Sequence, residues 1–143
     1  REGGMSTDAI DTLLNKKSGM LGLCGRSDFR DIASAIEHGD ERAKVAFDVY
    51  IHRLLHYIGA YMAVLGGLDV LTFTAGVGEN AANVRAAIGA RLAGLGFHLD
   101  AERNAVRSKQ PRVISTDDSP ITILVVPTNE ELQMAREVKL AIS

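Results

Sequence analysis

The stretch that most constrains the fold is residues 71–80, LTFTAGVGEN. Its apolar start is typical of a buried β-strand, and Gly76 and Gly78 predict a sharp turn directly after that strand. Apolar residues from Ala81 to Leu92 then recur at the three- and four-residue spacing of a helix. This order favours a nucleotide site, because glycine lets a ligand approach the main chain and the helix start presents free N–H groups.

The rest of the chain predicts a helix-rich α/β fold with few strands. We expect helices to begin near residues 6, 27, 40 and 129. The helix over residues 40–66 is the longest, and its broad apolar face needs the sheet or another subunit as a partner. Residues 20–25 indicate an apolar loop, residues 121–126 a second buried strand, and Val113 the start of a short strand.

Composition is that of one globular domain, with 143 residues, 46% hydrophobic and 24% charged. A net charge of -2 without a basic run gives no reason to expect nucleic acid or an anionic membrane as a partner. The single cysteine, Cys24, is expected to be a small buried side chain, and a chain with no disulfide fits a reducing, cytoplasmic location. We find no signal peptide and no apolar run of membrane-spanning length. Because the sequence begins with Arg1, we expect a piece of a larger protein or a processed chain.

A second informative stretch is residues 127–131, PTNEE. Thr128 as N-cap and Glu131 three residues later predict a capping box, which leaves Glu130 without a role in the cap. Glu130 follows a predicted strand, at the edge of the sheet where α/β proteins bind ligands. The carboxylate either complements the helix dipole, worth ~0.3–1 kcal/mol, or holds Mg²⁺ beside a nucleotide's phosphates. The spacing alone favours the interaction of Glu130 with the helix dipole.

A third stretch, residues 27–30, also has two interpretations. Asp28 or Ser27 can cap a helix while Arg30 is solvated, and this is the simpler interpretation of the stretch in isolation. Alternatively, the Asp28 carboxylate can bind a ribose hydroxyl while Phe29 and Arg30 form the walls around an adenine.

Taken together, these stretches resemble the C-terminal part of the acetate kinase family. The matching segments are LNKKSG (14–19), SDFR (27–30), FTAGVGEN (73–80), GLGF (94–97) and PTNEEL (127–132), in the family's order. The resemblance covers nearly the whole chain and about the final third of the family's length.

The resemblance implies a fold that is part of a ribonuclease-H-like, actin-like ATPase domain. Residues 1–143 would be the C-terminal nucleotide-binding and dimerisation portion of a larger kinase. That kinase would transfer the γ-phosphoryl group of ATP reversibly to acetate, giving acetyl phosphate and ADP, with Mg²⁺. It would be a homodimer, and its preference for acetate over propionate or butyrate stays open.

Site residues are implied by the resemblance as well. Asp28, Phe29 and Arg30 would bind the adenosine, and Glu130 would serve Mg²⁺. The loop over adenine, ribose and phosphate would consist of Gly76, Val77, Gly78, Glu79 and Asn80. No catalytic residue is assigned to this chain, because the family's catalytic residues are expected upstream of Arg1. The chain alone, without the N-terminal part of the same protein, is therefore expected to be inactive.

Three other interpretations were considered. Gly76, Gly78 and Ala81, with Asp100 about 20 residues later, fit the fingerprint of an NAD-binding oxidoreductase, but the strand expected at residues 97–99 is too short for that fold. A non-catalytic nucleotide-binding or dimerisation module is a second alternative.

A metal site is the third. His52 and His56 lie four residues apart on the long helix, with Asp48 one turn earlier, which is workable metal spacing. Without a further ligand cluster we expect a solvated or interface stripe there.

Overall fold

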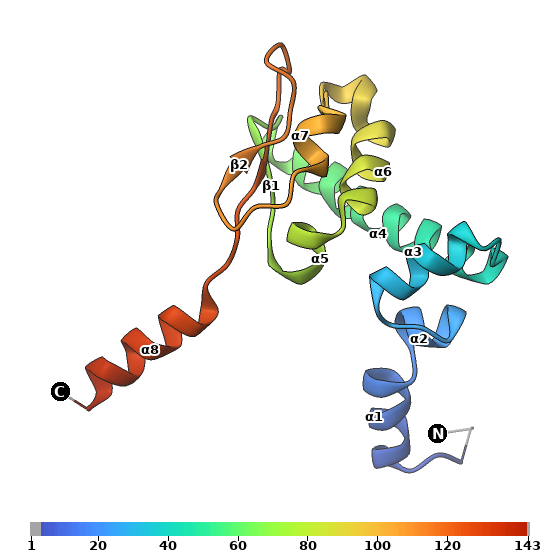
Figure 1. Ribbon diagram of the computed structural model, residues 1–143. Helices are drawn as coiled ribbons and strands as arrows, with labels where there is room; N and C mark the ends of the chain where they lie inside the picture. Colours follow the sequence, from blue (N-terminus) through green and yellow to red (C-terminus); the bar gives the residue numbers. More distant parts are fainter. Residues whose placement is uncertain (1–3, 143) are drawn as a thin grey trace. The chain divides into compact units, whose positions relative to one another are not determined.

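A computed structural model describes residues 4–142, so Arg1 lies outside the described part (Figure 1). The chain is α/β with many helices and few strands, which confirms the predicted fold class. It divides between Val64 and Leu65 into two compact units, and each is described by itself. None of the described helices is both long and apolar enough to cross a bilayer.

The first unit is helical. Its elements are α1 (Thr7–Lys16), α2 (Gly19–Cys24), α3 (Phe29–Glu37) and most of α4 (Glu41–Leu65). Ser6 caps α1 by accepting the N–H of Ala9 at 3.2 Å, as its position predicts. Asp40 does the same for α4, where one carboxylate oxygen accepts two main-chain N–H groups, at 3.0 and 3.1 Å. The predicted starts of these helices are confirmed.

Helix α2 occupies the segment that the sequence predicts as a loop, so that prediction is wrong. Its glycines suggested a break, but Gly25 ends the helix in the left-handed conformation, with φ 75°, and Gly22 lies inside it. A Cβ on Gly22 would lie 3.0 Å from the carbonyl oxygen of Lys17, so the glycine permits a close approach. Burial of an apolar side chain stabilises this short helix. Cys24 is 6% exposed, as expected for this thiol, and belongs to a core with these residues: Ile32, Ala35, Ala43, Ala46.

The long helix α4 shows its predicted faces only in part. Ile51 is buried, whereas Tyr61 on the predicted apolar face is 64% exposed. On the polar side, Lys44 donates to Asp48 at 3.1 Å, and His52 is exposed to solvent. Within residues 4–142 no group of three or more His, Cys, Asp or Glu side chains is placed to hold a metal ion.

The second unit contains a three-stranded sheet with the order β1-β3-β2. Strand β1 (Val70–Phe73) runs parallel to β3 (Thr122–Val125), and β2 (Arg112–Val113) pairs with β3 in the antiparallel direction. Strand β3 is central, and its Ile123 and Val125 are buried as predicted. Strand β1 lies at the edge and has no fully buried residue, so its predicted burial is wrong: it has a neighbouring strand on one side only.

The glycine turn expected after β1 is also not observed. A short helix, α5 (Ala75–Asn80), comes after the strand and leads into α6 (Ala82–Leu92). The left-handed residue is Ala75, with φ 58°, and neither Gly76 nor Gly78 has a positive φ. Gly78 is required for packing instead, because a Cβ there would lie 3.3 Å from the carbonyl carbon of Phe73.

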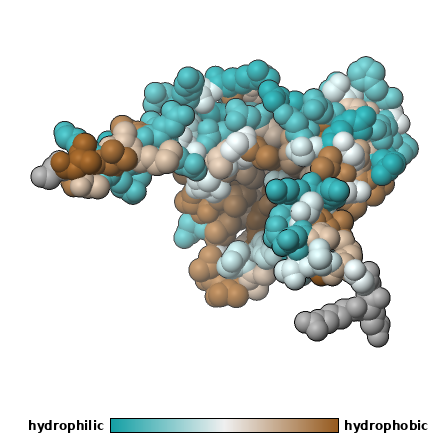
Figure 2. Space-filling model, turned by 90° about the horizontal axis from the view of Figure 1, so that it is seen from below, coloured by the Kyte–Doolittle hydropathy of each residue, from teal (hydrophilic) through white to brown (hydrophobic). Residues whose placement is uncertain are grey.

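The remaining elements are the 3₁₀ turn η1 (Ala93–Leu95), α7 (Ala101–Ala105) and α8 (Glu130–Ala141). The predicted final helix is thus confirmed, but none of its residues is buried. Val138 and Leu140 are 60% and 78% exposed, and Figure 2 shows hydrophobic surface at the end of this helix.

A buried arginine joins α5, α6 and α7. Arg85 of α6 is 1% exposed, and its Nη1 donates to the carbonyl oxygens of Gly78 at 2.8 Å and Glu79 at 2.9 Å. Its Nε and Nη2 donate to the side-chain and main-chain oxygens of Asn104, at 2.7 and 2.8 Å. Asn104 in turn donates to the carbonyl oxygen of Ala82. The guanidinium therefore donates to carbonyl groups at the end of α5, where a helix leaves its last carbonyls without a partner of its own.

Replacing Arg85 with Met should lower the free energy of unfolding by about 3 kcal/mol, because several buried carbonyl groups lose a charged donor. Chemical denaturation of the protein with and without the substitution measures this. Arg91→Met is the matched control on the same helix. Since Arg91 is exposed, its loss should change the stability by less than about 0.5 kcal/mol. Equal effects of the two substitutions would contradict a structural role for Arg85.

Candidate functional site

A pocket of the second unit lies where β1 and β3 end. It is open, has a volume of about 340 Å³, and is lined by these residues: Ala75, Gly76, Thr128, Asn129, Glu130, Glu131. The parallel pairing, which ends with Phe73 opposite Val125, brings the two carboxyl ends to one edge of the sheet. The pocket therefore joins the segments that come after the two strands, where α/β sheets bind ligands.

Hydrogen bonds hold these two segments together beyond the strands. The main-chain N–H of Val126 donates to the carbonyl oxygen of Phe73 at 2.9 Å, and Thr74 Oγ1 donates to the carbonyl oxygen of Val126 at 2.8 Å. One carboxylate oxygen of Glu79 accepts both the N–H of Thr128 at 2.9 Å and its hydroxyl at 3.2 Å. The edge of the pocket is thus fixed by contacts between residues about 50 positions apart.

The capping box predicted for α8 is wrong. The N-cap is Asn129, whose Oδ1 accepts the N–H of Leu132 at 3.0 Å, while the hydroxyl of Thr128 is used by Glu79. Glu131 is therefore not needed for a cap and lines the pocket beside Glu130. Both acids lie in the first turn of α8, where the helix dipole favours negative charge.

The residues of the predicted glycine loop have different surroundings in the structure. Gly76 lines the pocket, and no atom lies within 4 Å of the place where its Cβ would be, so the main chain is open there. Val77, Gly78, Glu79 and Asn80 are not among the residues that line the pocket. Asn80 instead donates from Nδ2 to the carbonyl oxygen of Gly76 at 2.9 Å and closes α5.

The donors around the pocket suit a hard cation. Glu130 and Glu131 offer carboxylate oxygens, which Mg²⁺ prefers, and Mg²⁺ in nucleotide sites is held by one or two carboxylates together with phosphates and water. The open main chain at Gly76 leaves space for a phosphate or sugar beside those acids. The residues present therefore fit a nucleotide with its cation.

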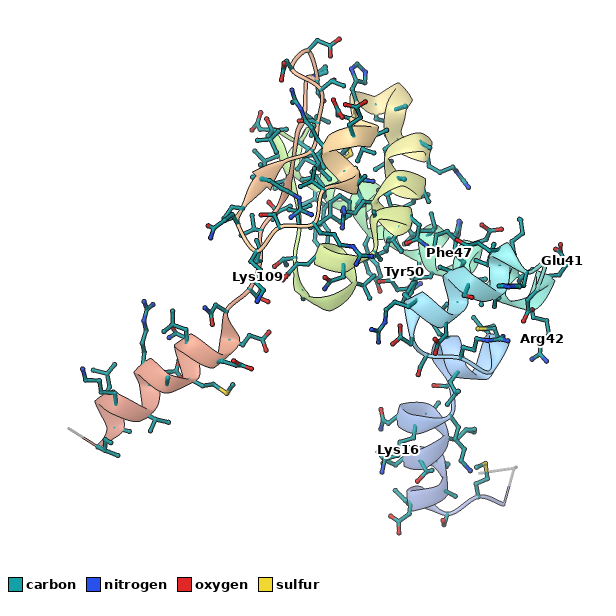
Figure 3. All side chains as sticks on the ribbon, viewed as in Figure 1. Lys16, Glu41, Arg42, Phe47, Tyr50 and Lys109 are labelled. Carbon is teal, nitrogen blue, oxygen red and sulfur yellow. The ribbon has the colours of Figure 1, made fainter. Side chains whose placement is uncertain are left out.

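Asp28, Phe29 and Arg30 belong to the first unit. Asp28 caps α3 by accepting the N–H of Arg30 at 2.8 Å, and the Arg30 guanidinium donates to both of its oxygens. These hydrogen bonds lower the pKa of the Asp28 carboxyl to about 2. The ring of Phe29 packs on that of Tyr50, which Figure 3 labels, at 4.5 Å between centroids and an angle of 58°. Burial raises the pKa of Tyr50.

Sequence analysis missed three of the residues that line the pocket, namely Thr128, Asn129 and Glu131. Their position was the available signal, because each lies within a few residues of the end of the strand predicted over residues 121–126. It also missed Arg85, although an arginine three, four and seven residues before Ile88, Gly89 and Leu92 occupies an apolar helix stripe. A charge in such a stripe indicates a buried hydrogen-bond network.

The oxidoreductase fingerprint does not describe this geometry. Gly76 and Gly78 lie within α5 and not in a turn between a strand and a long helix. Asp100, which the fingerprint assigns to a ribose, caps α7 by accepting the N–H of Arg103 at 2.9 Å.

Comparison with known proteins gives one consistent relationship. A sequence model of the acetokinase family matches residues 1–136. The chain is 60% identical over 137 residues to an acetate kinase of Streptomyces avermitilis, and 55% identical over 143 residues to one of Leifsonia xyli. These alignments cover 96% and 100% of the chain but only 34% and 36% of the relatives, so the chain spans about a third of their length.

Solved structures agree with these matches. The crystal structure of Porphyromonas gingivalis acetate kinase superposes with a TM-score of 0.85 at 40% identity, covering 99% of the chain and 36% of that protein. An acetate kinase from Entamoeba histolytica gives 0.88 at 35% identity, with 95% and 37% covered. A propionate kinase from Francisella tularensis gives 0.82 at 41% identity, with 94% and 34% covered.

The carboxyl of Asp28 should titrate with a midpoint near pH 2, and Arg30→Ala should raise that midpoint toward 3.8. Because the folded-state pKa is lowered, the stability that Asp28 contributes is present above pH 3.8 and is lost as the pH falls toward 2. An NMR titration of the carboxyl carbon measures both midpoints. Arg53→Ala, on another helix, is the control and should leave the Asp28 midpoint unchanged.

Proposed function

Because this chain belongs to the acetokinase family, we propose that it is the nucleotide- and Mg²⁺-binding portion of a kinase that transfers the γ-phosphoryl group of ATP reversibly to acetate. The products would be acetyl phosphate and ADP. The observation that supports this best is the pocket in which the open main chain of Gly76 faces the same space as Glu130. These two residues come from segments more than 50 positions apart, and the family resemblance implies that each binds a different part of one ligand.

The proposed chemistry is mainly positioning and neutralisation of charge, as in other phosphoryl transfers. Mg²⁺ bound there would neutralise the phosphate oxygens on which charge develops. Glu130, with Glu131 beside it, would hold the cation directly or through water. The main chain of residues 76–80 would lie along the nucleotide, with Gly76 as the residue of that segment that lines the pocket. The groups that bind the acid and stabilise the transition state belong to parts of the kinase outside this chain.

We assign the adenosine to the first unit. The carboxylate of Asp28 is ionised at neutral pH, so it can accept hydrogen bonds from ribose hydroxyls in place of those from Arg30. Phe29 supplies an aromatic face, and the side chain of Arg30, 89% exposed, would exchange its hydrogen bonds to Asp28 for a place on a purine.

The whole kinase is proposed to be a cytoplasmic homodimer, with residues 1–143 as its nucleotide-binding and dimerisation portion. The exposed apolar side chains near the end of α4 support a subunit contact there: Tyr61 is 64% and Val64 82% exposed. The similarity to a propionate kinase keeps propionate as an alternative acceptor.

The direct test is a chimaera in which this chain replaces the matching third of the Streptomyces avermitilis acetate kinase. We expect the chimaera to form acetyl phosphate from ATP and acetate, and the 143-residue chain alone to form none. Titration with Mg²⁺–ATP and with NAD then distinguishes the classes of function. Binding of NAD without any response to ATP would replace the kinase with an oxidoreductase, and ATP binding by an inactive chimaera would favour a non-catalytic module.

Glu130→Ala in the chimaera should lower turnover and raise the Mg²⁺ concentration needed for half-maximal rate, by about tenfold or more. Folding should be nearly unaffected, because Glu130 is exposed. The measurement is the rate as a function of Mg²⁺ at saturating ATP. Glu137→Ala, farther along the same exposed helix, is the control. An unchanged Mg²⁺ dependence would remove Glu130 from the site.

Substitutions at the two glycines of α5 should have opposite consequences. Gly76→Val adds a side chain to the open side of the pocket and should weaken ATP binding with little loss of stability. Gly78→Ala forces a Cβ against Phe73 and should lower the free energy of unfolding by about 1–3 kcal/mol. Calorimetric ATP titration and thermal unfolding of both variants measure the two effects. If both variants bind ATP as tightly as the unsubstituted protein, this result would argue against a nucleotide beside α5.

A further inference from the structure

We propose that the side chain of Glu79 is a positioning residue, which holds the start of α8 and thereby places Glu130. This inference rests on the proposed function of the pocket and assigns Glu79 a role apart from contact with the nucleotide. Its basis is the contact between Glu79 and Thr128, which are 49 positions apart in the chain.

The start of α8 has few other constraints. None of the residues of α8 is buried, so packing does not fix the helix. Beyond the last strand hydrogen bonds, the contact of Glu79 with Thr128 is the described tertiary hydrogen bond nearest to Glu130. Thr128 lies two residues before Glu130, so the position of its main chain determines where that carboxylate begins.

Glu79 is itself held firmly. Its carbonyl oxygen accepts from Arg85 at 2.9 Å, and Arg85 is buried and bonded to Asn104. A continuous set of hydrogen bonds therefore leads from the core of the second unit through Glu79 to Thr128. Hydrogen bonds to a carboxylate are stronger than those between neutral groups, which suits a contact that lies partly in solvent.

The geometry also suggests how to separate position from charge. A single oxygen of Glu79 accepts both hydrogen bonds, so a glutamine at this place can make the same two contacts through its amide oxygen. If Glu79 acts by position, glutamine replaces it. If Glu79 acts by its charge on a cation or a ligand, glutamine fails as completely as alanine.

The experiment uses the full-length chimaera with Glu79→Ala, Glu79→Gln and Thr128→Val, and with Glu102→Ala as an exposed control in the same unit. The first readout is hydrogen exchange of the amides at residues 127–131 without Mg²⁺ or nucleotide. The second is the Mg²⁺ concentration for half-maximal rate at saturating ATP.

We expect Glu79→Ala to accelerate exchange at Thr128 and to raise the half-maximal Mg²⁺ concentration by about tenfold or more. Glu79→Gln and the Glu102→Ala control should remain close to the unsubstituted protein in both readouts. Thr128→Val should have a smaller effect, because it removes the hydroxyl hydrogen bond to Glu79 and leaves the main-chain one. Adding it to Glu79→Ala should cause no further loss, because Glu79→Ala already removes both.

The proposal is overturned if Glu79→Gln is as impaired as Glu79→Ala, or if Glu79→Ala leaves the Mg²⁺ requirement unchanged. A chimaera whose unsubstituted form shows no response to Mg²⁺–ATP would refute the proposed function instead. In that case unchanged amide exchange in Glu79→Ala would also refute the contact, since this readout needs neither ligand.

Discussion

The parallel hydrogen bonding between β1 and β3 is the interaction on which the second unit depends. It aligns Phe73 with Val125, so the chain leaves both strands at the same edge. An open stretch of main chain lies directly after β1, and a pair of acids in the first turn of a helix lies shortly after β3. Neither segment forms a pocket alone; the pairing of two four-residue strands brings them together into one.

The buried Arg85 stabilises the segment that comes after β1 at this edge. A buried guanidinium is usually paired with a carboxylate, but this one is surrounded by neutral carbonyl oxygens at the end of α5 and on Asn104. Burial lowers the pKa of the arginine, with a smaller contribution from the nearby charge of Arg112. The guanidinium still remains charged at neutral pH, because an arginine cannot be deprotonated under these conditions. The second unit thus keeps a permanent positive charge beside the end of α5, the helix whose first residues line the pocket.

Much of the fold could be predicted from the sequence, because apolar periodicity and capping residues are local signals. They located α1, α3, α4, α8 and the central strand, and Asp28 and Asp40 act as N-caps at their expected places. Glycine ended the long helix at residue 66 as predicted, but two other predictions that depended on glycine as a breaker were wrong. Gly22 lies inside α2, where the buried Cys24 outweighs its low helix propensity. Gly76 lies inside α5, whose carbonyl groups accept hydrogen bonds from Asn80 and Arg85. The predicted capping box is wrong for a related reason. The hydroxyl of Thr128 donates to Glu79, and no local sequence pattern reveals that partner. The positions of Gly76 and Glu130 at one edge of the sheet could be predicted, because the ends of the two strands are visible in the sequence. The role of Arg85 could not, because it depends on which side of α6 is buried.

The backbone of Ala75 has a consequence for recognition. A residue with a Cβ is held in the left-handed region, at a cost of roughly 1–2 kcal/mol, at the lip of the pocket and directly before Gly76. The surrounding hydrogen bonds meet that cost when the protein folds. A ligand that requires this bend finds it preorganised, and so its affinity is not reduced by ordering the chain at the moment of binding.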